Sequence, residues 1–183
     1  MDTTIVARWR EWEGNGTQHL VMSSRHDGSF VDAVAISSDP YPFAAHYKIA
    51  MRPDWLTRRV EVGLVGGDKV LILEADGTGS WAKNGEPIPA LDGVFEPDLS
   101  ISPFTNTLAV KRLRLAKGES AEIRTAYVFV PTLEVFADPQ RYTCLEEGRR
   151  YLYESLDSDF RREIMFDEHG LVTDYPGLFR RLL

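Results

Sequence analysis

The chain has 183 residues, of which 43% are apolar and 27% are charged, and its formal net charge at pH 7 is −7. This length and composition predict a globular protein with one domain over residues 1–183, and they exclude an intrinsically disordered chain. The acidic balance disfavours nucleic acids and anionic membrane surfaces as partners, because both repel negative charge.

The N-terminal segment and the cysteine content indicate the compartment. The segment MDTTIVARWREWEG lacks the basic region and the apolar stretch of a secretory signal. Cys144 is the one cysteine, so no internal disulfide can form, which is typical of a reducing environment. No apolar run reaches the length of a membrane span. We therefore expect a cytoplasmic protein without an integral membrane segment, and its oligomeric state stays open.

Alternation of apolar and polar residues with a period of two dominates the chain. It is clear in residues 45–51, 56–64 and 121–129, and it predicts strands with one buried face and one solvated face. In the second of these runs Arg58 falls in phase with Val60 and Val62. An arginine on a buried face needs an ion-pair partner or a solvated cavity, and both alternatives are open.

Turn signals separate these runs and set the fold class. Examples are Gly66-Gly67-Asp68 and Asn84-Gly85, whose residues tolerate the positive φ of tight hairpins. The spacing predicts a mainly β protein, an antiparallel meander that forms a barrel or half-barrel. Few short helices are expected: one or two turns within 139–148 and a short helix over 177–183. Residues 105–115 fit neither period.

The sequence offers no recognisable catalytic constellation. Its histidines, His19, His26, His46 and His169, lack the spacing of metal ligands on a helix. There is no G-x-S-x-G motif and no phosphate-binding glycine loop. We therefore predict no catalytic residue, no metal site and no cofactor, and a binding protein rather than an enzyme.

One enzymatic alternative stays open. Carboxylates could hold a divalent ion that polarises a phosphoryl oxygen, which would make the protein a metal-dependent hydrolase of phosphate esters or anhydrides. The acids that could serve are Asp92, Glu96, Asp98 and Asp174.

Polar and aromatic side chains at strand and turn positions are the candidate ligand contacts. Residues 149–155 put arginine and tyrosines in one stripe, and Thr105, Asn106 and Thr107 follow a proline. Tyrosines suit a pocket wall, since each ring offers apolar area and a hydroxyl. A core strand and a capped turn are the structural alternatives. The candidates are Arg58, Trp81, Asp98, Thr105, Asn106, Thr107, Tyr142, Arg149, Tyr151, Tyr153, Asp174 and Tyr175.

Two long motifs carry a family resemblance. Residues 102–108 read Ser-Pro-Phe-Thr-Asn-Thr-Leu, and residues 174–181 read Asp-Tyr-Pro-Gly-Leu-Phe-Arg-Arg. In these segments, and in Tyr151–Ser155, the chain resembles the bacterial family of putative glycolipid-binding proteins. The resemblance implies an antiparallel β-barrel or half-barrel. It also implies binding of a small amphipathic ligand, a glycolipid or lipid headgroup, in the cavity of that barrel.

Overall fold

The computed structural model describes residues 2–38 and 42–183, and one sheet dominates it. The strands are β1 (Thr3–Glu11), β2 (Thr17–Arg25), β3 (Gly28–Ser37), β4 (Phe43–Met51), β5 (Thr57–Leu64), β6 (Val70–Ala75), β7 (Trp81–Lys83), β8 (Glu86–Pro87), β9 (Glu96–Leu99), β10 (Ser120–Phe129), β11 (Glu134–Glu146), β12 (Arg150–Ser155), β13 (Arg161–Phe166), β14 (Val172–Tyr175) and β15 (Phe179–Arg181). The helices are the 3-10 turn η1 (Pro89–Leu91) and α1 (Phe104–Leu113).

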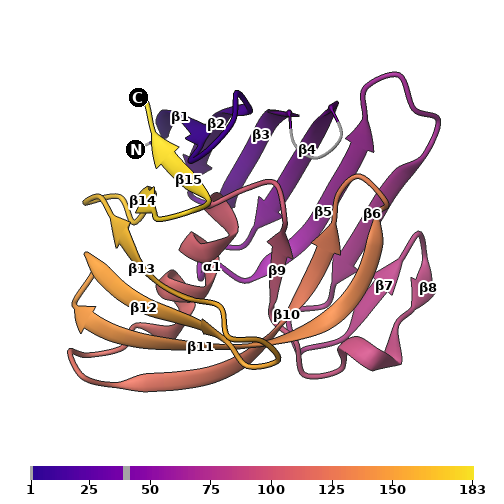
Figure 1. The fold of residues 1–183 in the computed structure, drawn as a ribbon. Coiled ribbons are helices and arrows are strands. Elements are labelled where there is room, and N and C mark those ends of the chain that lie inside the picture. Colours follow the sequence, from indigo (N-terminus) through magenta and orange to yellow (C-terminus); the bar gives the residue numbers. More distant parts are fainter. Residues whose placement is uncertain (1, 39–41) are drawn as a thin grey trace.

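The sheet is a continuous meander that does not close. Its strand order is β8-β7-β6-β5-β4-β3-β2-β1-β15-β14-β13-β12-β11-β10-β9, and every pair except β9 with β10 is antiparallel. Pairing of β1 with β15 joins the first half of the sheet to the second and brings the two ends of the chain together (Figure 1). The predicted class, a mainly β antiparallel half-barrel with few helices, is confirmed.

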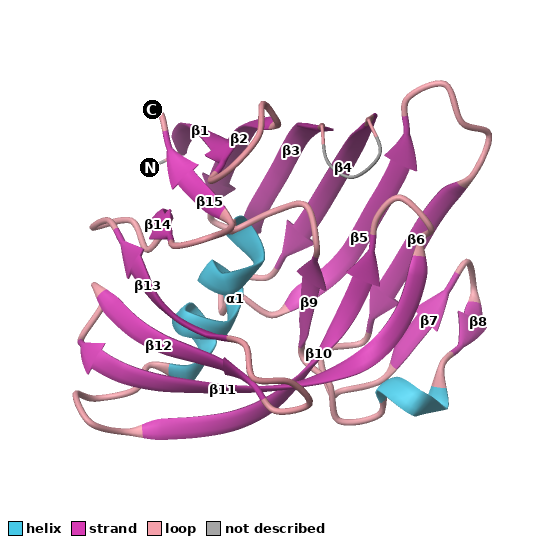
Figure 2. Ribbon diagram, in the orientation of Figure 1, coloured by secondary structure: helices cyan, strands magenta, loops and turns pink. Residues whose placement is uncertain are grey.

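Helix α1 lies between the two halves of the sheet (Figure 2). It begins after Pro103, and each residue from Phe104 to Val110 is buried. Its Phe104 packs into the cluster formed mainly by the first half, and its Val110 packs into the cluster of the second half. A helix buried on all sides has no polar stripe, which explains why its sequence showed no clear period.

Two helical predictions are wrong. Residues 139–148 belong mostly to β11, where Asp138, Gln140, Tyr142 and Cys144 are buried at every second position. This alternation of side chains favours a strand more strongly than the proline and glycine of the segment favour a turn. The C-terminal 177–183 segment forms β15 rather than a helix, because β1 and β14 both offer it backbone partners.

The helices of the described residues are short. None of them, over 2–38 and 42–183, is long and apolar enough to cross a membrane.

Candidate functional site

A hollow of about 470 Å³ opens between the second half of the sheet and the start of α1. We call it the polar hollow. Its lining comes from β9 to β12, from β14 and β15, and from the loops beside them. The lining residues are Asp98, Leu99, Ser100, Ser102, Asn106, Tyr127, Phe129, Phe136, Asp138, Tyr153, Ser155, Asp157, Ser158, Phe160, Tyr175, Leu178 and Phe179.

Two carboxyl groups form the polar part of this lining. The Gln140 side chain is fully buried, and its Nε2 donates to Asp98 Oδ2 at 2.8 Å and to Asp138 Oδ2 at 2.7 Å. Thr105 Oγ1 donates to the second oxygen of Asp98 at 2.7 Å. Burial raises the pKa of both carboxyls, since a charged carboxylate loses hydration there. The two acids therefore keep their protons to a higher pH than free aspartic acid.

Two tyrosines present unpaired hydroxyls to the polar hollow. Tyr153 and Tyr175 are only 7% and 5% exposed, and both line it. Their hydroxyls have no hydrogen-bond partner among the described residues, whereas the neighbouring Tyr142 donates to Asn106 Oδ1 at 2.8 Å. Burial raises the pKa of both phenols, so they stay protonated. Each offers a hydrogen bond that only a ligand or solvent can take.

A second hollow of about 580 Å³ adjoins the first, and we call it the apolar hollow. It lies between the end of β1, the end of β3 and the β10–β11 turn, and its walls include Trp9, Phe43 and Val130. The two hollows share the lining residues Ser100, Tyr127, Phe129, Leu178 and Phe179. The two hollows are therefore adjacent, and we call the two together the cleft, of which one part is more polar and the other mainly apolar.

The polar hollow contains four of the residues singled out in the sequence, namely Asp98, Asn106, Tyr153 and Tyr175. Two more candidates lie directly behind its wall: Thr105 binds Asp98, and Tyr142 binds Asn106. The stripe of tyrosines and the Thr-Asn-Thr segment thus meet in space although they lie about forty residues apart in the chain.

The prediction that Arg58 points inward is wrong. Ala50 pairs with Arg59, but the next residue of β4, Met51, pairs with Thr57. This β-bulge leaves Arg58 unpaired and exposed, while Thr57 takes the buried position. An extra residue in one strand reverses the side-chain alternation beyond it. Arg58 therefore has no place in the cleft.

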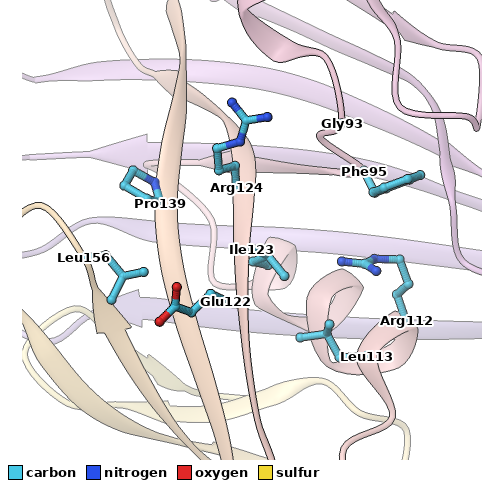
Figure 3. Close-up of a pocket in the computed structure, with 9 residues that line it drawn as sticks. All are labelled: Gly93, Phe95, Arg112, Leu113, Glu122, Ile123, Arg124, Pro139 and Leu156. Carbon is cyan, nitrogen blue, oxygen red and sulfur yellow. The ribbon is translucent and has the colours of Figure 1, made fainter.

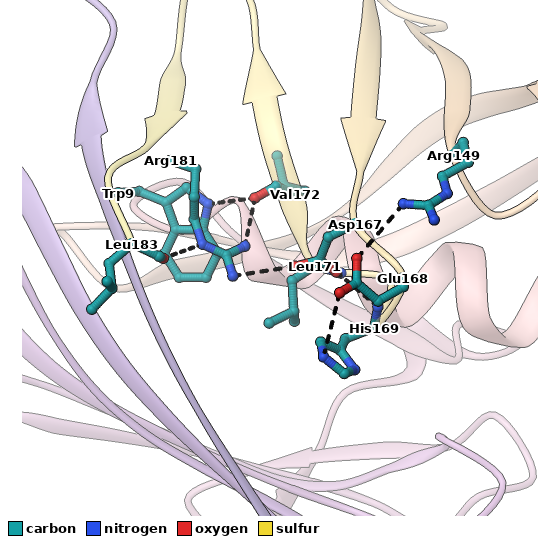
Figure 4. Close-up of polar contacts among 9 residues, drawn as sticks. All are labelled: Trp9, Arg149, Asp167, Glu168, His169, Leu171, Val172, Arg181 and Leu183. Carbon is teal, nitrogen blue, oxygen red and sulfur yellow. Dashed lines mark hydrogen bonds and ion pairs between the residues drawn. The ribbon is translucent and has the colours of Figure 1, made fainter.

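The other candidates also lie away from the cleft. Arg149 is in the turn after β11, half exposed and 3.8 Å from Glu168, as Figure 4 shows. The Trp81 indole is buried in the core and donates to the carbonyl of Val94. The further three are Thr107, buried inside α1, Tyr151, which accepts a bond from Gly148, and Asp174, 3.5 Å from Arg180.

The acids of the hydrolase alternative lie in different surroundings. Glu96 is buried and paired with Arg112, Asp174 faces Arg180, and Asp92 is exposed. Within the described parts of the chain, no three His, Cys, Asp or Glu side chains cluster as metal ligands would. The described residues thus form no group of metal ligands that the hydrolase alternative could use.

Sequence reasoning missed several wall residues, above all Asp138 and Gln140. Gln140 falls in the 139–148 segment assigned to a helical turn and Asp138 directly precedes that segment, so their shared face was not considered. The signal that could have found them is the period of two from Asp138 to Cys144, which continues through proline. The aromatic residues Tyr127, Phe136 and Phe160 carry no local signal, since only tertiary folding brings them together.

A further hollow of about 430 Å³ is lined by charged groups that have hydrogen-bond partners outside the lining (Figure 3). Arg112 pairs with Glu96, Arg124 donates to the carbonyl of Asp92, and Glu122 accepts from Arg141. The polar hollow, with two tyrosine hydroxyls that have no protein partner in the described part of the chain, is the stronger candidate for a ligand site.

The Thr107 hydroxyl provides a test of how α1 is held. It is fully buried and has no partner among the described residues. We expect Thr107→Val to leave the free energy of unfolding unchanged or to raise it by up to about 1 kcal/mol, since a buried unpaired hydroxyl costs energy. Thr105→Val removes the bond to Asp98 and should lower it by about 1–2 kcal/mol. Urea unfolding of both variants measures the difference, and a large loss in Thr107→Val would contradict the assignment.

Comparisons with known proteins show the fold and the family of the chain. The chain is similar to the crystal structure of a DUF1089 family protein from Pseudomonas aeruginosa, with a TM-score of 0.80, 38% sequence identity and coverage of 95% of each chain. A comparison with curated proteins gives no match. A family model described as "Putative glycolipid-binding" matches residues 6–181. Because this match covers nearly the whole chain, the protein belongs to that family.

Proposed function

We propose that the protein binds one amphipathic small molecule in the cleft that the two adjacent hollows form. The polar, hydroxyl-bearing head occupies the polar hollow, and an alkyl chain lies in the apolar hollow. The description of the family, which names glycolipids, is consistent with such a ligand. The proposal places no catalytic step in the cleft.

The observation that carries the proposal is the adjacency of two chemically different hollows. Their shared wall joins Asp98, Asp138 and the unpaired tyrosines to a surface of aromatic and aliphatic side chains. The Tyr153 and Tyr175 hydroxyls have no protein partner among the described residues and are not sealed from the hollow, so they are free to hydrogen-bond with hydroxyls of a ligand. The apolar surface beside these hydroxyls suits the second part of the ligand, its alkyl chain.

The apolar hollow supplies the binding energy. Transfer of an alkyl chain from water contributes about 0.8 kcal/mol per methylene, before the cost of association is subtracted. The rim of the cleft is itself apolar, since Phe129 and Phe136 are 43% and 46% exposed and Leu178 is 39% exposed. A ligand that covers these side chains removes them from water as well.

The tyrosine hydroxyls give the test. We expect the double variant Tyr153→Phe with Tyr175→Phe to bind octyl β-glucoside about tenfold more weakly, because two hydrogen bonds of about 0.5–1.5 kcal/mol each are lost. Isothermal titration below the critical micelle concentration measures the affinity. Native mass spectrometry of gently purified protein should also show a bound amphiphile.

Tyr151→Phe is the matched control. Tyr151 is as buried as the other two tyrosines, but its hydroxyl binds the Gly148 amide outside the cleft. This variant should bind octyl β-glucoside as the unmodified protein does. The proposal fails if the unmodified protein shows neither a co-purifying amphiphile nor binding of an octyl amphiphile.

A further inference from the structure

The charges around the polar hollow all have one sign. Asp98, Asp138 and Asp157 line it, and its lining, as the structure describes it, contains no lysine, arginine or histidine. Arg162 lies nearby, but its guanidinium stacks on the Phe160 ring at 4.7 Å and donates to the Pro176 carbonyl at 3.1 Å. Carboxylates buried without a cation are unfavourable, so this hollow favours a ligand that brings positive charge.

Aromatic rings complete the surroundings of these acids. Tyr153, Phe160 and Tyr175 contact one another with ring centroids 6.0–6.3 Å apart. Tyr127 and Phe136, whose centroids are 5.1 Å apart, form another part of the same lining. The faces of such rings are electron-rich, and they attract ammonium groups that are desolvated on binding.

We propose that the head of the ligand carries an ammonium group, held between the Asp98 and Asp138 carboxylates and the rings of Tyr153 and Tyr175. This inference rests on the proposed function and names the chemical class of its ligand, a cationic amphiphile such as one with an amino-sugar or trimethylammonium head. The unpaired tyrosine hydroxyls receive the uncharged polar atoms of that head. An anionic head, such as a phosphate, meets three carboxyl groups and is excluded by repulsion.

The protonation of the Asp98 and Asp138 carboxyls gives a second way to recognise a cationic ligand. Burial raises the pKa of the Asp98 and Asp138 carboxyls in the free protein, and each of them also faces Tyr127 and Tyr153. A bound ammonium group favours the ionised carboxylates and lowers their pKa. Binding therefore releases protons, and affinity for the cation rises as the pH climbs through the raised pKa values of the free protein.

The test compares three probes of equal chain length: octyltrimethylammonium, octyl β-glucoside and octyl phosphate. Isothermal titration of the full chain below each critical micelle concentration gives the affinities. We expect the ammonium probe to bind roughly tenfold more tightly than the glucoside, and the phosphate probe most weakly. Only the ammonium probe should bind more tightly as the pH rises from 4 to 7.

Substitutions of single acids show which carboxylates cause the preference for the ammonium probe. Asp138→Asn keeps the bond from Gln140 and removes the charge, so the preference for the ammonium probe should fall to about threefold or less. Asp157→Asn, at an exposed position on the rim, serves as the second variant if Asp138→Asn does not fold. Asp92→Asn removes an exposed acid outside the cleft and should leave the preference unchanged.

Two outcomes would overturn the inference, and they are distinguishable from failure of the proposed function. If the glucoside binds as tightly as the ammonium probe, the cleft takes a neutral head and the proposed function survives. If the preference for the ammonium probe persists in the acid variants, these carboxylates do not hold the head, so the inference fails while the proposed function survives. If none of the three probes binds, the proposed function itself fails and the inference falls with it.

Discussion

Replacement of Arg112 by methionine should lower the free energy of unfolding by about 3–5 kcal/mol, because it leaves a buried carboxylate without its partner. Glu96 is 3% exposed, and its two carboxylate oxygens both accept hydrogen bonds from the Arg112 guanidinium. This pair ties the last turn of α1 to β9, the strand that carries Asp98. Urea unfolding monitored by tryptophan fluorescence measures the loss.

A double variant separates the charge from the packing. Glu96→Gln combined with Arg112→Met removes both charges, so it should recover most of the lost stability. Arg141→Met breaks an ion pair whose Glu122 side chain is 62% exposed, and it should cost no more than about 1 kcal/mol. If Arg112→Met costs as little as Arg141→Met, the pair does not hold α1 against β9.

Replacement of Trp9 by alanine should lower the free energy of unfolding by about 3–5 kcal/mol, the usual cost of deleting a buried tryptophan side chain. Trp9 is fully buried in β1, and its indole Nε1 donates to the carbonyl of Val172 in β14 at 2.7 Å. Arg181 stacks over the ring at 5.0 Å and is also 3.2 Å from Asp167 (Figure 4). The side chain thus joins the first strand to the last two.

Trp9→Phe separates ring packing from the hydrogen bond. The carbonyl of Val172 keeps the bond from Arg181 Nη1 at 3.1 Å, so this variant should lose only about 1–2 kcal/mol. Differential scanning calorimetry of both variants measures the difference. Trp9 also lines the apolar hollow, so Trp9→Ala should weaken octyl β-glucoside binding even where the protein is folded. A Trp9→Ala protein as stable as Trp9→Phe would contradict the assigned role.

The cleft could be predicted from the sequence only in part. Asp98, Asn106, Tyr153 and Tyr175 came from short segments whose residue types suit a polar ligand. Arg58 failed because one unpaired residue reversed the alternation of its strand, and alternation was the argument for it. Gln140 was missed because proline and glycine in the 139–148 segment suggested a turn, and Asp138 was missed because it directly precedes that segment.

The sequence by itself determined the class of the fold, the strands with clear period-two alternation and the family, because these depend on local pattern and on contiguous motifs. Only the tertiary structure decided which polar residues share a cleft. Its walls come from strands and loops between residues 9 and 179, and no local pattern records which of them meet. The same holds for α1 and β15: one is a helix buried on every side, and the other becomes a strand because β1 and β14 offer it backbone partners.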